Sequence, residues 1–206
     1  STFDASGGVD PVEIDDIAAP CFLAGTRIEV ASGMKPVERL RPGDLVQTLD
    51  RGLQPLRWVG HSAVPGVGPL APVRIRAGAM GNGRDLLDSP NHRILLRMAA
   101  AEFHFGQSDV LVPAKALIDG VAVTAAPRAT AHYVHLLLPR HEMVFSEGLA
   151  SESLFTGAMA LDAFGDAARA EMQAILASGG SEAHVLNRTA LTYGEARALL
   201  AFCRRA

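Results

Sequence analysis

Cys21 is the residue of this sequence best suited to nucleophilic chemistry, because a thiolate is the strongest nucleophile among the side chains. It directly follows residues 1–20, which are acidic, rich in Gly, Ala and Pro, and without sustained periodicity. Such a composition predicts a flexible leader. A cysteine at the start of a domain can attack the carbonyl of the residue before it, here Pro20. A free cysteine is more often simply buried, so other residues must decide between the two interpretations.

Three segments of the chain carry a common pattern. The first is Cys21-Phe22-Leu23-Ala24-Gly25-Thr26-Arg27-Ile28, continued by Gly33, Val37-Glu38, Leu40, Gly43-Asp44 and Val46; the second is Asp88-Ser89-Pro90-Asn91-His92-Arg93; the third comprises Tyr133-Val134-His135-Leu136, His141 and Ser146-Glu147-Gly148-Leu149-Ala150-Ser151-Glu152-Ser153. Together they resemble the motifs of the Hint (Hedgehog/intein) family of self-processing domains, particularly its bacterial group Hint_2. The resemblance covers about residues 21–157. It implies a mainly β, horseshoe-like fold with pseudo-twofold symmetry and a nucleophilic leading cysteine.

The resemblance assigns roles to Ser89 and His92, since the family's second motif is a Thr or Ser followed three residues later by an essential His. Conversion of an amide into a thioester requires a proton on the departing nitrogen and support for the carbonyl oxygen as it gains charge. We expect His92 to be the acid, and Ser89 to orient the ring or hold the carbonyl. His135 is a candidate base and His141 a less supported one, because a histidine in an alternating strand is more often a surface or packing residue.

The sequence departs from two branches of that family. Splicing inteins end in His-Asn, and the asparagine cyclises to release the downstream segment, whereas this chain has Ser151-Glu152. A carboxylate cannot perform that step, so we expect cleavage only on the N-terminal side of Cys21. No long apolar or aromatic segment resembles the sterol-recognition extension of Hedgehog proteins, so water or a small outside nucleophile is the expected acceptor. Pro20 crowds the attacked carbonyl, which predicts a slow first step.

The elements that must position these residues are short strands followed by helices. From Cys21 to Gly157, β-rich runs alternate with turn residues, a pattern typical of an all-β barrel or sandwich-like fold. Residues 161–178 change to helical spacing, with two glycines after them as a stop. A second helix is predicted over 192–205, where Thr192 and Glu195 have capping-box spacing. The predicted domains are the leader (1–20), the Hint domain (21–157) and a C-terminal helical extension (158–206).

Composition and spacing exclude several classes of function. The net charge of −3 gives no global field that would attract nucleic acid or an anionic membrane, and no apolar run approaches the roughly 18 to 20 residues of a membrane span. The histidines lack HExxH spacing and no CxxC occurs, so we expect neither a metal nor a cofactor. Asp44 and Asp50 are expected turn formers, and Cys203 is expected to pack within an amphipathic helix.

The sequence therefore predicts a monomeric domain that cleaves itself at the Pro20–Cys21 bond through a thioester. Its substrate is its own N-terminal flanking segment. One alternative is a degenerate Hint domain that serves as an interaction or secretion module, and another is a cysteine protease that acts on separate substrates. The cellular location stays open. Because the sequence begins at Ser1 rather than Met, one interpretation is an excised part of a larger secreted bacterial protein.

Overall fold

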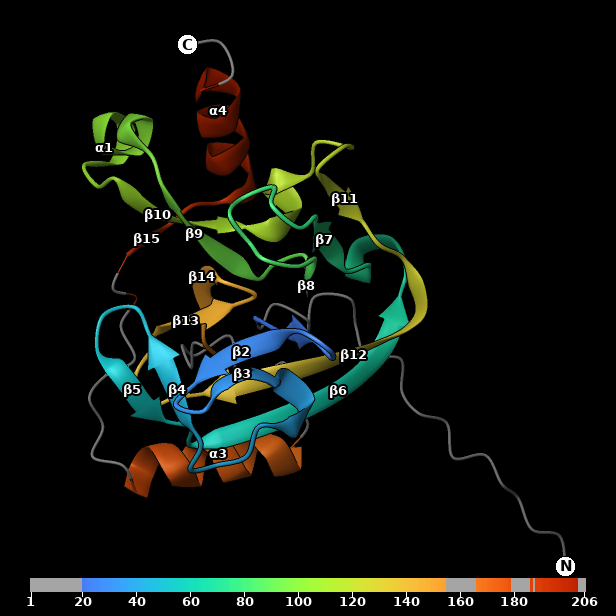
Figure 1. Ribbon diagram of the computed structural model, residues 1–206, viewed down its shortest axis with the longest axis vertical. Helices are drawn as coiled ribbons and strands as arrows, with labels where there is room; N and C mark the ends of the chain where they lie inside the picture. The colour runs from blue at the N-terminus through green and yellow to red at the C-terminus, as the bar shows by residue number, and fades with distance from the viewer. Residues whose placement is uncertain (1–19, 155–165, 179–185, 187, 204–206) are drawn as a thin grey trace, which may run out of the picture.

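The computed structural model describes residues 20–154, 166–178, 186 and 188–203. The expected leader, apart from Pro20, lies outside these residues. Strands dominate from Phe22 to Glu152 and helices follow (Figure 1). The prediction of a mainly β fold with C-terminal helices is confirmed. Within the described residues, no helix combines the length and the apolar character that a membrane crossing requires.

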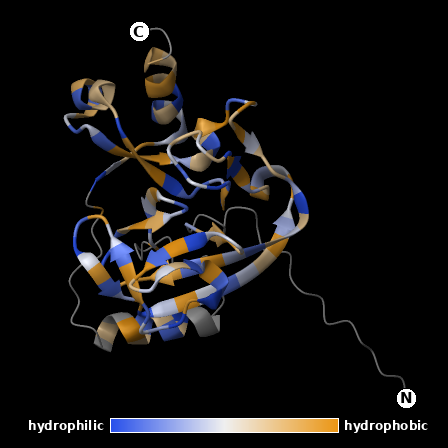
Figure 2. Ribbon diagram, viewed as in Figure 1, coloured by the Kyte–Doolittle hydropathy of each residue, from blue (hydrophilic) through white to orange (hydrophobic). Residues whose placement is uncertain are grey.

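A six-stranded antiparallel sheet forms the centre of the fold around the leading cysteine. Its strand order is β11-β7-β8-β1-β12-β6, so the short strand β1 lies between β8 and β12. The long strands β6 and β12 run side by side and curve together (Figure 1), and hydrophobic and hydrophilic residues alternate along them (Figure 2). The strands are β1 (Phe22–Leu23), β6 (Trp58–Gly66), β7 (Val73–Ile75), β8 (Leu86–Asp88), β11 (Val123–Ala125) and β12 (Arg128–Leu137).

A nine-stranded sheet completes the β structure. Its order is β15-β10-β9-β14-β13-β2-β4-β5, with β3 paired to β2. The strands are β2 (Arg27–Val30), β3 (Gly33–Pro36), β4 (Leu45–Thr48), β5 (Gly52–Pro55), β9 (Arg93–Arg97), β10 (Asp109–Pro113), β13 (Met143–Ser146), β14 (Leu149–Glu152) and β15 (Thr189–Ala190). Glu147 and Gly148 join β13 to β14 with φ angles of 48° and 93°, and a tight hairpin turn needs such positive φ values. The hairpin places Glu152 beside β9, through the pairing of Ser151 with Ile94.

Short helical segments fill the connections between strands. The 3₁₀ segments are η2 (Val37–Arg39), η3 (Gly68–Leu70) and η4 (Ala114–Leu117), and an α-helix, α1, spans Ala99–Phe105. We did not predict α1 from the sequence, although its alanines favour a helix. It ends at Gly106, which has a φ of 72° and donates its N–H to the Glu102 carbonyl at 2.9 Å. Helix α1 packs on β10 in the largest core cluster, together with α4.

The C-terminal elements add to the β structure rather than standing apart from it. Helix α3 (Asp166–Ser178) lies against β6, where Trp58 Nε1 donates to Glu171 at 2.9 Å and Met172 is buried. Strand β15 pairs in parallel with β10. Helix α4 (Tyr193–Cys203) begins with the predicted capping box: Thr192 N donates to the Glu195 carboxylate at 2.8 Å, and Glu195 N donates to Thr192 Oγ1 at 3.3 Å. Predicted helical residues 161–165, 204 and 205, and the stop glycines, lie outside the described residues.

Candidate functional site

Cys21 lies at the centre of the six-stranded sheet, directly before β1. Its neighbour Phe22 pairs with Val134 of β12 on one side and with Asp88 of β8 on the other. These pairings hold Cys21 between the two segments that carry the other candidate residues. The Cys21 side chain is fully buried in a small cluster that includes Tyr133. Sheet pairing, rather than a flexible loop, therefore fixes the position of the candidate nucleophile.

His135 of β12 contacts both of the groups that an attack by Cys21 would join. Its Nδ1 lies 3.4 Å from Cys21 Sγ and 3.2 Å from the carbonyl oxygen of Pro20. Burial lowers the pKa of His135 to about 4, although the Pro20 carbonyl acts in the opposite direction. The ring is therefore neutral at neutral pH. A neutral imidazole beside a thiol is able to accept its proton.

The Ser62 hydroxyl of β6 allows His135 to take either tautomer. Ser62 Oγ lies 3.3 Å from His135 Nε2, and a hydroxyl can donate or accept a hydrogen bond. When Nε2–H donates to Ser62, the Nδ1 lone pair is available to the Cys21 thiol. When Ser62 donates to Nε2 instead, Nδ1–H can donate to the Pro20 carbonyl. The same ring can thus remove the thiol proton or polarise the carbonyl that is attacked.

Ser89 and His92 form a turn between β8 and β9 that closes over the Cys21 backbone. His92 N donates to the Ser89 carbonyl at 3.1 Å, and Ser89 N donates to the Cys21 carbonyl at 3.0 Å. The His92 ring has Nδ1 at 3.0 Å from that same Cys21 oxygen and Nε2 at 3.0 Å from the Glu152 carbonyl oxygen. Both ring nitrogens of His92 therefore face backbone acceptors, one of them in the residue whose amide would be broken.

The surroundings of Cys21 keep its sulfur protonated at rest. Burial raises the pKa of the Cys21 thiol far above its usual range. A hydrogen bond from Ser89 favours the thiolate, while the carboxylates of Asp88 and Glu152 oppose it. A nucleophilic attack by Cys21 would consequently require its thiol to lose the proton to a neighbouring base during the attack rather than beforehand. His135 is in position to accept that proton.

Glu152 is buried at the end of β14, and its carboxylate is anchored. The side chain is 1% exposed. Its carboxylate accepts hydrogen bonds from Arg93 N at 3.1 Å and from the Arg93 guanidinium at 3.2 Å. His141 Nε2 lies 3.2 Å from the same carboxylate. His141 thus contacts Glu152, and the Glu152 backbone carbonyl in turn orients His92.

The structure brings Cys21, Ser89, His92 and His135 into one cluster. Sequence reasoning missed Ser62, whose contact with His135 depends on the pairing of β6 with β12, and it treated Asp88 only as a part of a motif. The expectation that Cys203 packs within its helix is wrong, because its side chain is exposed on α4. The expected turn role of Asp44 agrees with its hydrogen bond from Arg41 N at 2.8 Å.

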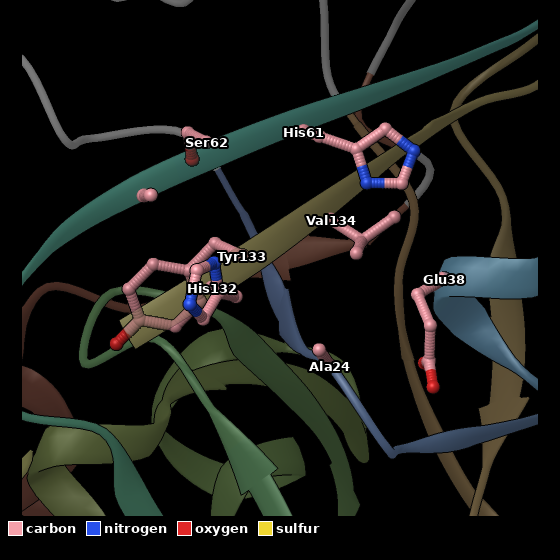
Figure 3. A pocket seen from close by; sticks show the side chains of 8 residues that line it. Ala24, Glu38, His61, Ser62, His132, Tyr133 and Val134 are labelled. Atoms are coloured by element: carbon pink, nitrogen blue, oxygen red, sulfur yellow. The ribbon is translucent and has the colours of Figure 1, made fainter. Parts of the chain in front are cut away.

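A pocket of about 380 Å³ lies beside the cluster, along β6 and β12 (Figure 3). Ser62, His61 and Val134 line it, together with Glu38 from η2. In Figure 3, His61 and Glu38 lie on one side of the pocket, and Tyr133 on the other. Ser62 is the lining residue that also contacts the His135 ring.

Comparison with known proteins gives a family match over most of the chain. A sequence model described as Hint domain matches residues 20–158. Among solved structures, a bacterial intein-like domain from Clostridium thermocellum is 12% identical, with a TM-score of 0.46 over 65% of this chain and 97% of that one. A DnaB intein from Synechocystis sp. PCC 6803 is 9% identical, with a TM-score of 0.45 over 65% of this chain and 98% of that one. No curated protein matches the sequence.

Proposed function

The chain belongs to the Hint domain family, and from this premise we propose that it cleaves itself at the Pro20–Cys21 peptide bond. The proposed reaction is an N-to-S acyl shift that turns this bond into a thioester, followed by transfer of the acyl group to water or a small nucleophile. The chain's own N-terminal flanking segment is the substrate. Every group that the reaction needs comes from one copy of the chain, so a monomer suffices.

One observation carries this proposal: His135 Nδ1 lies within 3.4 Å of the Cys21 sulfur and 3.2 Å of the Pro20 carbonyl oxygen. The nucleophile and the carbonyl that it would attack thus share one imidazole. Such an arrangement replaces a collision by proximity, which can supply several kcal/mol of rate enhancement, on the order of 7 or more in well-oriented cases.

In the first step, the Cys21 thiol gives its proton to His135 Nδ1 as the sulfur attacks the Pro20 carbonyl carbon. The carbon–sulfur bond closes a five-membered ring that contains the Cys21 nitrogen. The carbonyl oxygen becomes an oxyanion beside the imidazolium that has just formed on His135, and this opposite charge stabilises it. The buried, neutral state of His135 suits it to this role, because an imidazole protonated beforehand could accept no proton.

In the second step, the bond from the Pro20 carbon to the Cys21 nitrogen breaks, and the nitrogen takes a proton from His92. The products are a thioester on Cys21 Sγ and a free amino group on Cys21. His92 Nδ1 already binds the carbonyl of the same residue at 3.0 Å, and Ser89 N holds that oxygen in place. The sulfur proton now lies on His135 and His92 has lost one proton. His135 then releases a proton to solvent and His92 takes one up, so the net change is one proton moved from sulfur to nitrogen.

In the third step, a water molecule or another small nucleophile attacks the thioester carbon. The carbon–sulfur bond breaks, the sulfur regains a proton, and with water the segment leaves with a carboxylic acid on Pro20. The pocket beside Ser62 offers such a molecule a place near the His135 ring.

The proposed reaction ends with cleavage and does not continue to splicing. Splicing would require a side-chain amide to attack the downstream backbone, whereas Glu152 presents a carboxylate. Arg93 and His141 hold that carboxylate, and an ionised carboxylate is a poor nucleophile toward an amide. The chain segment after Ser151 therefore stays attached.

The test is incubation of the purified full chain with a small thiol, followed by mass analysis. We expect a released segment that ends at Pro20, no release from Cys21→Ala, and no fragment beginning near Ser153. A rate independent of protein concentration is expected for an intramolecular reaction, and a rate that rises with concentration would instead favour a protease acting on separate chains. Persistence of the full-length chain, with Pro20→Gly equally inert, would favour the interaction or secretion module.

A further inference from the structure

Asp88 carries an unusual carboxylate at the end of β8. Its side chain is 1% exposed. Within the described part of the chain, neither of its carboxylate oxygens accepts a hydrogen bond. Burial of a carboxylate without such partners costs several kcal/mol or more, unless an opposite charge compensates it. A positively charged neighbour is therefore required.

His92 is the neighbour with which Asp88 forms an ion-pair contact. Asp88 Oδ1 lies 3.8 Å from His92 Nδ1. The two nitrogens of the His92 ring each lie 3.0 Å from a backbone carbonyl oxygen, that of Cys21 and that of Glu152. A carbonyl only accepts, and a neutral imidazole has a single N–H. Both contacts are hydrogen bonds only when both ring nitrogens carry a proton, which gives His92 a positive charge.

The other titratable groups around His92 do not supply or remove that charge. They come from the segment before β1, from β12, β14 and β9, and from the segment before β13: Cys21, His135, Glu152, Arg93 and His141. Burial keeps Cys21 and His135 neutral. The Glu152 carboxylate is engaged by Arg93 and His141. Asp88 is therefore the carboxylate available to balance a charged His92.

We propose that Asp88 is a positioning residue for the cleavage reaction, whose carboxylate is the counter-charge that keeps a second proton on the His92 ring. The His92 ring thereby carries the proton that the departing Cys21 nitrogen requires. Asp88 touches none of the reacting atoms and promotes the reaction through His92. Its charge also raises the pKa of the Cys21 thiol, so loss of that effect alone would speed cleavage rather than slow it. This inference rests on the proposed function for its catalytic consequence, but the charge pair can be tested without cleavage.

The charge pair between Asp88 and His92 forms only within a limited range of pH. Burial raises the pKa of Asp88 to about 6, and His92 acts in the opposite direction. Above pH 6 the carboxylate is charged and holds the second proton on His92. Below pH 6 Asp88 is itself protonated and its influence on His92 disappears. The contribution of Asp88 to cleavage therefore belongs to neutral and alkaline pH.

The first experiment compares cleavage rates of the full chain as wild type, Asp88→Asn and Asp85→Asn, with hydroxylamine as acceptor, between pH 5 and 8. Asp85 lies in the same segment but is exposed, so Asp85→Asn is the matched control and should follow the wild type. We expect Asp88→Asn to be about 10-fold slower at pH 8, because it weakens the general-acid help of His92, whose complete loss would cost about 10² to 10⁴ in rate. The two rates should converge at pH 5. An equal slowing at both pH values would overturn the proposal, since a merely structural role predicts that result.

The second experiment needs no cleavage. In the full chain carrying Cys21→Ala, ¹⁵N NMR of the imidazole nitrogens reports directly how many protons the His92 ring carries. We expect two at pH 7, and one when Asp88→Asn is added. A singly protonated ring at pH 7 with Asp88 present would overturn the proposal, even if Asp88→Asn itself failed to fold. A wild-type chain that does not cleave would contradict the proposed function. The NMR measurement would still show whether Asp88 and His92 form a charge pair.

Discussion

Replacement of Asp88 by Asn should stabilise the fold at neutral pH and have little effect near pH 4. Burial raises the pKa of Asp88 from 3.8 to about 6 in the folded chain. The folded state therefore binds this proton more tightly than the unfolded state, and the free energy of unfolding falls as the pH rises between about 4 and 6. The stability associated with the protonated carboxyl is fully present below the ordinary pKa and is lost above pH 6. Asparagine has no such proton to lose.

The size of the effect follows from the two pKa values. They differ by about two, and one pKa unit corresponds to about 1.4 kcal/mol, so the loss amounts to about 3 kcal/mol. The 1% exposure of the side chain leaves little solvent screening to reduce it. The assay is urea unfolding of Cys21→Ala with and without Asp88→Asn, at pH 4 and at pH 7.5. The difference between the two chains reports Asp88 together with its partner His92, because more distant titrating groups are common to both.

We expect Asp88→Asn to gain about 3 kcal/mol relative to its parent between the two pH values. Asp85→Asn, the exposed control, should shift with its parent at both. If the parent and Asp88→Asn show the same dependence on pH, Asp88 is not the buried acid inferred here, and the charge pair with His92 loses its basis. A gain in stability on removal of Asp88 would also indicate that this carboxylate is kept at a cost to the fold, as is common at functional sites.

Three further changes probe other parts of the site. Ser62→Ala removes the hydroxyl that lies 3.3 Å from His135 Nε2. It should slow cleavage by about 10-fold, because the His135 tautomer with an unprotonated Nδ1 loses its hydrogen-bond partner at Nε2. An unchanged single-turnover rate would exclude a role of Ser62 in setting the tautomer. Pro20→Gly should accelerate thioester formation, because it relieves the crowding at the attacked carbonyl. Intact mass over time follows the rate, and a slower rate would show that the proline instead helps to position that carbonyl. Arg93→Met should lower the free energy of unfolding by about 2 kcal/mol in urea titrations, because it removes the guanidinium hydrogen bond and ion pair from the buried Glu152 carboxylate. Arg84→Met, at an exposed position, is the control expected to match the wild type.

The parts of the site that sequence could predict are those encoded by local spacing. Cys21 directly precedes the first strand, and Ser89 and His92 are three positions apart within one turn, so their patterns are visible in the linear sequence. The capping box of Thr192 and Glu195 is equally local. The third motif made His135 a candidate base, whereas the alternation of its strand favoured a surface or packing residue. Neither pattern showed which strand lies beside His135.

The parts that sequence could not predict depend on pairing between distant strands. Ser62 meets His135 across 73 residues because β6 pairs with β12, and a single strand carries no sign of its register. The charge on Asp88 matters because that residue is buried beside His92, whereas an aspartate before a turn would ordinarily be taken for an exposed turn former. Cys203 shows the opposite error, since an amphipathic pattern alone did not tell which face of α4 is covered. The domain boundaries predicted at residues 20 and 157 stay predictions.

The central claim is that the Cys21 sulfur accepts the Pro20 acyl group, and an intact-mass time course under hydroxylamine tests it most directly. Hydroxylamine attacks thioesters readily and ordinary peptide bonds slowly. The full wild-type chain should release a segment that ends in a hydroxamate on Pro20, together with a product that begins at Cys21. His92→Ala should be slower by about 10² to 10⁴, and Cys21→Ala, which lacks the attacking atom, should remain intact. Equal cleavage of the wild type and Cys21→Ala would contradict the account.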